Sequence, residues 1–423
     1  MNDAARRVQR TYLLLTLLTT LAASFIWGVN TLFLLSAGLT NEEAFAANAV
    51  FSLGQVLFEV PTGVVADTRG RRFSFLLGAA TLLASTLLYL YMWQISAPFL
   101  GWALASLLLG LGFTFFSGAT EAWLVDALKS TDFEGDLEGV FGRAQVVGGV
   151  AMLTGSVAGG VVAQLTDLGV PYILRAALLG VTLVVAWWAM HDMGFTPQRD
   201  VTPLKAVRNV VNGAVDGGLR NPPVRWLMIS APFVGGVGIY AFYAFQPYLL
   251  ELYGDPNAYS IAGLAAAILA GAQILGGLFV RRIRLLFSRR TDALLIGGVL
   301  NVALLFLVGF MPNFVVAIVL LAVWALIFAI QMPIRQAFIN GAIRSEQRAT
   351  VLSFDSLMSS AGGVVFQPIL GRTADIYGYP ASYMVAGVIR AIALPFVYLA
   401  RRENSPSDPI LADPAAPEQA AAS

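Results

Sequence analysis

Long apolar stretches separated by short polar breaks fill most of the chain. Twelve such stretches are found, at 11–37, 43–66, 73–94, 97–126, 140–165, 171–192, 225–252, 258–280, 291–311, 314–338, 350–371 and 379–400. A bilayer core about 30 Å thick takes roughly 20 helical residues to cross. A β-barrel would show stretches of about ten residues with alternating hydrophobicity, whereas these stretches are longer and continuously apolar. The pattern therefore predicts an all-α polytopic membrane protein with twelve transmembrane helices.

The longest polar interruption lies at the middle of the chain and separates two sets of six predicted helices. Within it, Leu204, Val207 and Val211 recur at three- and four-residue spacing, which predicts an amphipathic helix on the membrane surface. The expected domains are residues 1–192, an N-terminal six-helix bundle; 193–224, a cytoplasmic linker; 225–402, a C-terminal six-helix bundle; and 403–423, a disordered cytoplasmic tail rich in Ala, Pro and acids.

The two halves also share a short outer turn. "DLGVPYIL" (167–174) precedes the sixth stretch and "DIYGYPASY" (375–383) precedes the twelfth, and each carries an Asp, a Gly and a Pro. Halves with the same number and direction of helices are related by an axis along the membrane normal. The match is short, but it favours two six-helix pseudo-repeats.

Composition supports a membrane protein and excludes several kinds of chemistry. Residues are 57% hydrophobic and 12% charged, whereas a soluble domain has about a quarter charged residues. The chain has no Cys and one His, so it offers no clustered nucleophile, base or metal ligands. It also lacks the GxxxxGK[ST] loop that binds ATP phosphates. We therefore expect neither an enzyme nor an ATP-driven pump, and no cofactor.

The positive charges predict the orientation. With the N-terminus inside, all but three of the 26 Lys and Arg residues fall in inner loops and tails, as the positive-inside rule requires. The exceptions are Arg175 and Arg372, placed at outer ends, and Arg390, placed within the last stretch. We expect a multi-pass protein of the plasma (inner) membrane with both termini in the cytoplasm.

One break between two stretches carries a motif, "GVVADTRGRR", after the second predicted helix. The chain has this motif between the second and third stretches, twelve stretches in all and a central linker. In these features it resembles the major facilitator superfamily, from residue 11 to about 402. The family signature places Gly, Asp, Gly, Arg and a basic residue here, matched by Gly63, Asp67, Gly70, Arg71 and Arg72. "SGATEAWLVDAL" (117–128) and "RATVLSFDSLMSSAGGVVFQPILGRTAD" (348–375) look like stretches of bacterial exporters of the family.

The resemblance implies a substrate cavity between the halves that opens to one side at a time. It also implies that the motif forms an inner latch, with Asp67 beside the start of the eleventh helix and Arg71 paired with Asp126 on the fourth. An acid near a helix N-terminus is favoured by about 0.3–1 kcal/mol. The alternative is that Arg69, Arg71 and Arg72 serve only to set the orientation.

Two other family patterns are incomplete. A pattern that many proton-coupled exporters carry on the fourth helix aligns with Ser106, Leu109 and Gly110, without its Arg. A fifth-helix antiporter pattern aligns with "GSVAGG", which keeps Gly155, Gly159 and Gly160 and lacks the Pro. These glycines are expected to permit close helix packing. The missing Arg and Pro weaken an antiporter assignment.

Acids inside the predicted helices each need a reason, because an ionisable group near the bilayer centre costs roughly 2.5–3.5 kcal/mol. Glu59 follows Gln55 and precedes Gly63 and Asp67 at four-residue spacing. It is either a protonatable coupling group or a structural acid hydrogen-bonded to a neighbouring helix. Glu121 is either a coupling acid or an inner-gate partner, and Asp355 is either a coupling acid or an interface group.

Aromatic and amide residues on the expected pore helices are candidates for the cavity wall. They are Trp27, Asn30, Phe113, Phe116, Tyr240, Tyr243, Gln246, Trp324, Phe328 and Gln331, which Gln145 and Gln273 can join. For any single aromatic residue, plain helix packing is the alternative. Together they suggest an apolar cavity with amides for orientation, suited to amphipathic molecules. The cations expected at mid-membrane reduce to Arg390.

The function predicted from these features is secondary active transport by alternating access, driven by a proton gradient and exporting amphipathic, drug-like small molecules. Uptake or uniport of a neutral, sugar-like metabolite is the alternative within transport. A non-transporting or lipid-handling protein of the same fold is the alternative outside it. The expected partners are a small-molecule substrate and the bilayer, with no nucleic acid, and the expected state is a monomer.

Overall fold

The computed structural model describes residues 3–131, 133, 135–197, 202–344 and 347–410. The helices are α1 (Asp3–Trp27), α2 (Asn30–Ser36), α3 (Asn41–Arg69), α4 (Arg71–Gln94), α5 (Phe99–Phe116), α6 (Ala119–Lys129), α7 (Leu137–Leu165), α8 (Val170–Ala189), α9 (Pro203–Ala214), α10 (Pro222–Tyr253), α11 (Tyr259–Arg284), α12 (Arg290–Phe310), α13 (Phe314–Ala342), α14 (Arg348–Ala391) and α15 (Ala393–Arg402). A π-helical turn, Val215–Leu219, follows α9.

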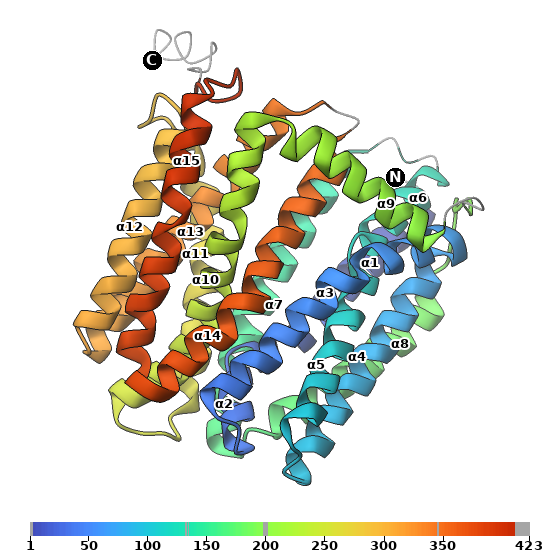
Figure 1. Ribbon diagram of the computed structural model, residues 1–423. Helices are drawn as coiled ribbons and strands as arrows, with labels where there is room; N and C mark the ends of the chain where they lie inside the picture. The colour runs from blue at the N-terminus through green and yellow to red at the C-terminus, as the bar shows by residue number, and fades with distance from the viewer. Residues whose placement is uncertain (1–2, 132, 134, 198–201, 345–346, 411–423) are drawn as a thin grey trace, which may run out of the picture.

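The helices account for twelve membrane crossings. In the described residues, 11 helical stretches are long and apolar enough to cross a membrane. The last of them, Thr350–Arg402, turns back at Gly378, whose φ of 80° and ψ of 167° interrupt α14 (Figure 1). Glycine reaches this backbone conformation without the steric cost of a side chain. The predicted all-α architecture with twelve crossings is confirmed.

Two crossings that the sequence predicts as continuous are broken. The first divides into α1 and α2 at Gly28 and Val29, and the fourth into α5 and α6 at Ser117 and Gly118. Gly28 lies against α11 of the other half, where an added Cβ would come within 2.8 Å of the Gly263 Cα. Hydropathy does not reveal these breaks, because each is short and lies between apolar residues that continue on both sides.

Two bundles of six crossings stand side by side, α1–α8 and α10–α15 (Figure 1). Between them α3 packs against α14 and α7 packs against α11. Helix α9, which lies at the predicted amphipathic segment, contacts both α3 and α14. The linker therefore touches one helix of each bundle at the end where α1 begins.

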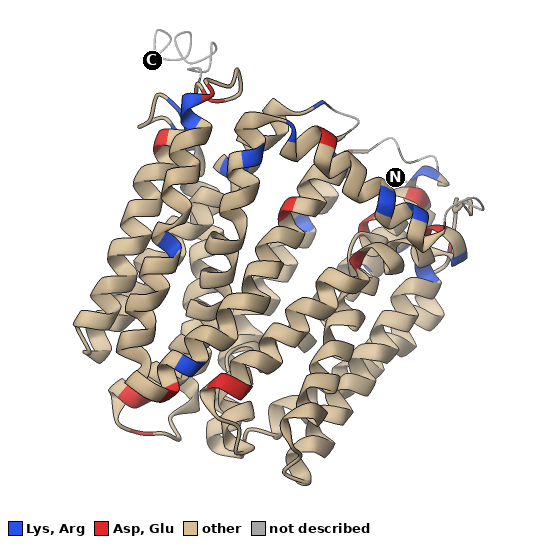
Figure 2. Ribbon diagram, in the orientation of Figure 1, with Lys and Arg blue, Asp and Glu red and all other residues tan. Residues whose placement is uncertain are grey.

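Charged residues are distributed unequally between the two ends of the molecule (Figure 2). The basic end, named here for Arg71, Arg72, Arg290 and Arg402, is where α1 begins and α15 ends. At the opposite end lie the turns that carry Glu42, Asp167, Asp255 and Asp375. Large apolar side chains face outward along the helices between the two ends, as in Leu57, Leu104 and Leu278, each more than half exposed. Lipid is the solvent that such a surface suits.

The chain after α15 folds back onto the C-terminal bundle. Asp408 is 1% exposed and accepts hydrogen bonds from the Thr291 backbone N–H (2.9 Å) and hydroxyl (2.8 Å). These bonds cap the start of α12, whose first N–H groups have no partner within the helix. The predicted disordered tail, 403–423, is therefore wrong for residues 403–410; its remainder, 411–423, lies outside the described residues.

The three glycines of the fifth crossing lie where helices approach closely. An added Cβ on Gly155 would collide with the Ser24 hydroxyl, and one on Gly159 with the Phe25 carbonyl oxygen. On Gly160 it would come within 2.8 Å of the Tyr259 carbonyl oxygen, in the other half. Gly155 and Gly159 thus pack α7 on α1, and Gly160 packs it on α11.

Gly159→Val is expected to destabilise the N-terminal bundle, because the Phe25 carbonyl belongs to a backbone that cannot move aside without breaking α1. Overpacking of this kind costs about 1–3 kcal/mol. Thermal unfolding of purified protein measures the change. The matched control is Gly180→Val, since a Cβ at Gly180 meets no atom within 4 Å. Equal unfolding temperatures for the two variants would contradict the prediction.

Candidate functional site: a cavity between the two halves

A cavity of about 1610 Å³ lies between the two bundles. One wall comes from α1, α3, α4, α5, α6 and α7, and the other from α11 and α14. The residues of both walls lie toward the basic end of their helices. Tyr12 and Thr16 are near the start of α1, and Ser353 and Ser356 are near the start of α14. The cavity therefore extends toward the basic end.

The opposite end is closed by hydrogen bonds between the halves. The Asp375 carboxylate of α14 accepts from the Asn41 N–H (2.9 Å), the Asn41 side-chain amide (2.9 Å) and the Glu42 N–H (2.8 Å). Both backbone donors belong to the first turn of α3, where N–H groups lack partners within the helix and favour a negative charge. Arg372 adds an ion pair with Glu42 at 3.2 Å. The structure is thus closed opposite the basic end.

A second closure joins α10 to the break in the first crossing. The Gln246 side-chain oxygen accepts from the Thr31 N–H (3.1 Å), and its NH₂ group donates to the Trp27 carbonyl (2.8 Å). In an unbroken helix these two backbone groups would bond to each other, because they are four residues apart. The Gln246 amide replaces that bond. Gln246, predicted on the cavity wall, therefore belongs to the closure instead.

The other predicted wall residues divide between cavity and bundle interior. Phe113 and Phe116 line the cavity, as does Gln145. Trp27 lines a neighbouring pocket that also includes Phe113 and Phe116. The side chain of Gln273 lies outside the described part of the chain.

Besides Gln246, several other residues predicted for the wall lie elsewhere in the structure. Asn30 lies inside the N-terminal bundle, where it donates to Asn48 (2.8 Å) and accepts from Tyr172 (2.9 Å). Tyr240 is fully buried and hydrogen-bonded to Ser382.

Trp324 is buried against Phe245, and Tyr243 is half-buried beside Phe242. All these residues keep their expected helix but turn toward neighbours in their own half or toward the contact between the halves. The aromatic residues on the cavity wall are instead Phe113 and Phe116 of the fourth crossing, together with Tyr12, Phe75 and Phe141 of three other helices.

Two of the three predicted coupling acids lie on the cavity wall, Glu59 and Glu121. Glu59 accepts a hydrogen bond of 2.6 Å from the hydroxyl of Ser117, at the break between α5 and α6. A hydrogen bond to a carboxylate is roughly twice as strong as one between neutral groups, so this contact depends on the charge of Glu59. Asp355 instead forms a buried ion pair with Arg335.

The loop motif forms a cluster of charges at the basic end. Arg71 donates to Asp67 at 2.5 Å and lies 4.0 Å from Asp126. Asp126, the expected partner of Arg71, is thus within reach of it, but the shorter contact is the one with Asp67. In the part of the chain that the structure describes, Asp67 pairs with Arg71 and makes no hydrogen bond to the start of α14. The latch role of these residues stays a prediction.

An acid that the sequence reasoning did not select also holds this loop. Asp192, just beyond α8, accepts from the Arg72 N–H at 2.8 Å. A Cβ on Gly70, whose φ is 112°, would collide with that carboxylate, whereas one on Gly63 would meet nothing within 4 Å. The position of Asp192 at the end of a predicted stretch was the available signal.

Comparison with known proteins decides the family. The model of the Major Facilitator Superfamily matches residues 12–287 and 259–420. The chain belongs to the major facilitator superfamily. It is 20% identical over 386 residues to an uncharacterized MFS-type transporter, MJ1560, of Methanocaldococcus jannaschii, an alignment that covers 91% of this chain and 95% of the relative.

Two solved MFS structures share the fold. A mutant of the nucleoside transporter NupG has a TM-score of 0.76 at 15% identity and covers 93% of this chain and 99% of its own. A bacterial homologue of the human lysosomal transporter Spinster, in an inward-facing and occupied conformation, has a TM-score of 0.72 at 15% identity, with 98% and 100% covered. This MFS protein is accordingly a multi-pass membrane transporter rather than an enzyme.

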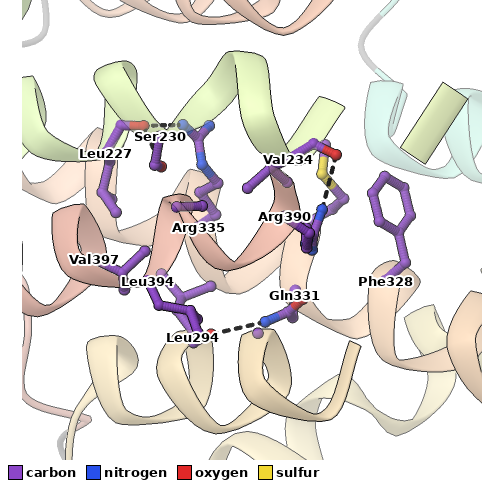
Figure 3. Close-up of a pocket in the computed structure, with 13 residues that line it drawn as sticks. Leu227, Ser230, Val234, Leu294, Phe328, Gln331, Arg335, Arg390, Leu394 and Val397 are labelled. Carbon is purple, nitrogen blue, oxygen red and sulfur yellow. Dashed lines mark hydrogen bonds between the residues drawn. The ribbon is translucent and has the colours of Figure 1, made fainter. Parts of the chain in front are cut away.

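Arg390, whose partner the sequence did not indicate, is 4% exposed in the C-terminal bundle of the transporter. It donates to the Val234 carbonyl at 2.8 Å (Figure 3). The same small pocket, of about 40 Å³, is lined by Phe328, Gln331 and Arg335. Phe328 and Gln331, also predicted for the cavity wall, thus lie inside this bundle.

Arg175, predicted at an outer end, lies in the second turn of α8, but its side chain points inward and is 1% exposed. It lines the pocket beside the cavity that Trp27 and Phe113 also line. The transporter therefore has a buried guanidinium next to its central cavity.

Proposed function

We propose that this transporter exports amphipathic small molecules in exchange for protons, with the basic end and both termini in the cytoplasm of the plasma (inner) membrane. The single observation that carries the proposal is the cavity, which is closed opposite the basic end and has Glu59 and Glu121 on its wall. A substrate would enter from the cytoplasm beside Phe113 and Phe116. The working unit is proposed to be a monomer.

Proton coupling would act through Glu59. Its carboxylate holds Ser117 at the break in the fourth crossing, and that crossing also carries Phe113, Phe116 and Glu121 on the same cavity. Protonation removes the charge that strengthens the hydrogen bond. A change at Glu59 would thus be passed to the crossing that carries Phe113 and Phe116.

Purified protein in liposomes with an imposed pH gradient tests the proposal. The panel contains a lipophilic cation, a lipophilic carboxylate, a neutral drug and a sugar. Movement of one or more amphipathic compounds, faster with the gradient than without it, is the expected result. Movement of the sugar alone, or amphiphile transport indifferent to pH, would overturn it.

Glu59→Gln is expected to remove the stimulation by the pH gradient while substrate exchange at equal pH continues, because glutamine keeps the shape but cannot release a proton. The measurement compares gradient-driven uptake with exchange in the same liposomes. Glu138→Gln, an exposed site in the first turn of α7, is the matched control. Full stimulation in Glu59→Gln would assign Glu59 a structural role.

A further inference from the structure

Arg175 is buried without an acidic partner. Its Nε donates to the Thr86 hydroxyl at 3.0 Å and its Nη1 to the Ala22 carbonyl at 3.1 Å, while the guanidinium lies 5.8 Å from the centre of the Phe113 ring. Its Nη2 has no hydrogen-bond partner. Among the described residues no Asp or Glu forms an ion pair with it.

Burying an unpaired guanidinium in this way costs free energy. A charge taken out of water is normally paired, and a buried donor without an acceptor adds its own desolvation cost. The neutral acceptors and the Phe113 ring offset part of this cost, since a cation over an aromatic face is attracted to it. They leave the positive charge uncompensated and the Nη2 amino group without an acceptor. An anion that reaches this guanidinium would supply both the negative charge and the hydrogen-bond acceptor that the protein does not provide.

The space beside Arg175 can admit such a group. A pocket of about 230 Å³ is lined by Arg175 and shares Thr19, Thr20, Phe113 and Phe116 with the central cavity. Its volume is close to the lower range of ligand pockets, about 300 Å³. The pocket is therefore a side branch of the transport cavity, and Phe113 stands at the junction.

The wall of this pocket carries donors and no acids. Besides the guanidinium it includes the Trp27 indole and the Thr20 hydroxyl, neither of which makes a side-chain hydrogen bond to another described residue. The rest of the wall is apolar, with Leu82 and Leu179 as examples. Donors around one cation, within apolar surroundings, match a carboxylate on an apolar body.

We propose that this pocket binds the carboxylate of a transported amphipathic acid, and that Arg175 forms the ion pair with it. The inference rests on the proposed export function and narrows its substrate class to organic monocarboxylates. Phe113, which covers the guanidinium, turns aside as the carboxylate enters. The apolar body of the substrate then lies along Phe116 and the central cavity.

Binding to purified protein in uncharged detergent tests the inference without any gradient. The probes are 4-phenylbutyrate, 4-phenylbutyramide and 4-phenylbutylamine, which share one apolar body and differ in the head group. Isothermal titration is expected to show the acid binding roughly tenfold to a hundredfold more tightly than the amide, the range that one hydrogen-bonded charge pair supplies, with the amine weakest. Equal affinities, or a preference for the amine, would overturn the proposal.

Variants separate recognition from folding. Arg175→Gln is expected to bring the affinity for the acid down to that for the amide, and Arg175→Lys to retain part of the difference. The readout is the ratio of the affinity for the acid to the affinity for the amide within one variant. A general loss of stability would lower both affinities and would not change this ratio. If Arg175→Gln does not fold, the ratio in the unaltered protein still decides.

The outcomes for the two proposals are distinguishable. Proton-driven transport of a lipophilic cation without acid-selective binding would overturn the carboxylate site and keep the export function. Acid-selective binding with transport indifferent to pH would keep the site and overturn the coupling.

Discussion

Gln246→Leu is expected to open the end of the molecule that is closed in this structure. The Gln246 side chain is fully buried and stands between the Thr31 N–H and the Trp27 carbonyl. Leucine can neither donate nor accept, so both backbone groups lose their partner in the closed arrangement. Each buried group left unpaired costs about 1–3 kcal/mol, which shifts an equilibrium by about 5- to 150-fold.

The open arrangement does not carry this cost. When the halves separate at that end, the Thr31 N–H and the Trp27 carbonyl can bond directly, and α1 and α2 become one helix. The variant therefore favours the conformation in which the first crossing is straight. By the same argument, we expect Gln246 to make these hydrogen bonds in the closed state only.

Distances between spin labels measure the shift. Because the chain has no cysteine, labels can be placed only where they are wanted. Leu100→Cys on α5 and Phe310→Cys on α12 report on the closed end, and both sites are exposed, at 77% and 68%. We expect their separation to increase in Gln246→Leu, and that between Lys129→Cys and Arg402→Cys at the basic end to decrease.

The matched control is Gln331→Leu. Gln331 also joins helices through its amide, donating to the Leu294 carbonyl (3.0 Å) and accepting from Asn301 (3.1 Å), but all three residues belong to the C-terminal bundle. Its loss is expected to lower stability without changing the separation of the halves. If both variants gave the distances of the unaltered protein, Gln246 would not control the closure.

The membrane crossings could be predicted from the sequence because each depends on the summed hydropathy of many consecutive residues. About 20 apolar residues in a row identify a helix whatever its neighbours are, and Gly378 marks the turn that hydropathy also shows. The loop motif was equally accessible, since Asp67, Gly70, Arg71 and Arg72 are close in sequence. Their local contacts, such as Arg71 with Asp67, follow from four-residue spacing on adjoining helices.

The direction of single side chains was less predictable, because it depends on rotation about each helix. Residues three apart differ by about −60° on a helix with 3.6 residues per turn. Tyr240 and Gln246 therefore point about 120° apart, although their spacing suggested one face. Tyr240 turns into its own bundle and Gln246 toward the other half.

The direction of the Arg175 side chain could not be predicted from the sequence either. Its distance from the start of α8 is only a few residues, which suggested a place at the membrane surface. The side chain is long enough to reach Thr86 and Ala22 in the bundle interior. Nothing in the sequence around Arg175 names those partners, which come from two other helices.

Asp355→Ala is expected to cause the largest loss of stability. Arg335 donates two hydrogen bonds to Asp355 and a third, of 2.8 Å, to the Leu227 carbonyl, so the pair ties α13 to α14 and α10. The two side chains are 11% and 10% exposed. Removing one member of a buried pair leaves the other charge uncompensated and costs about 3–5 kcal/mol. Thermal unfolding of purified protein measures the loss.

A double variant then separates the two roles that Asp355 can have. Asp355→Leu combined with Arg335→Met replaces the pair by apolar side chains of similar size, a change that is often neutral or stabilising. If the pair is structural, the double variant recovers stability and keeps the stimulation of transport by a pH gradient. If Asp355 couples protons, it recovers stability and loses that stimulation. Because the carboxylate is neutralised by Arg335 and lies off the cavity wall, whereas Glu59 lies on it, we expect the first outcome.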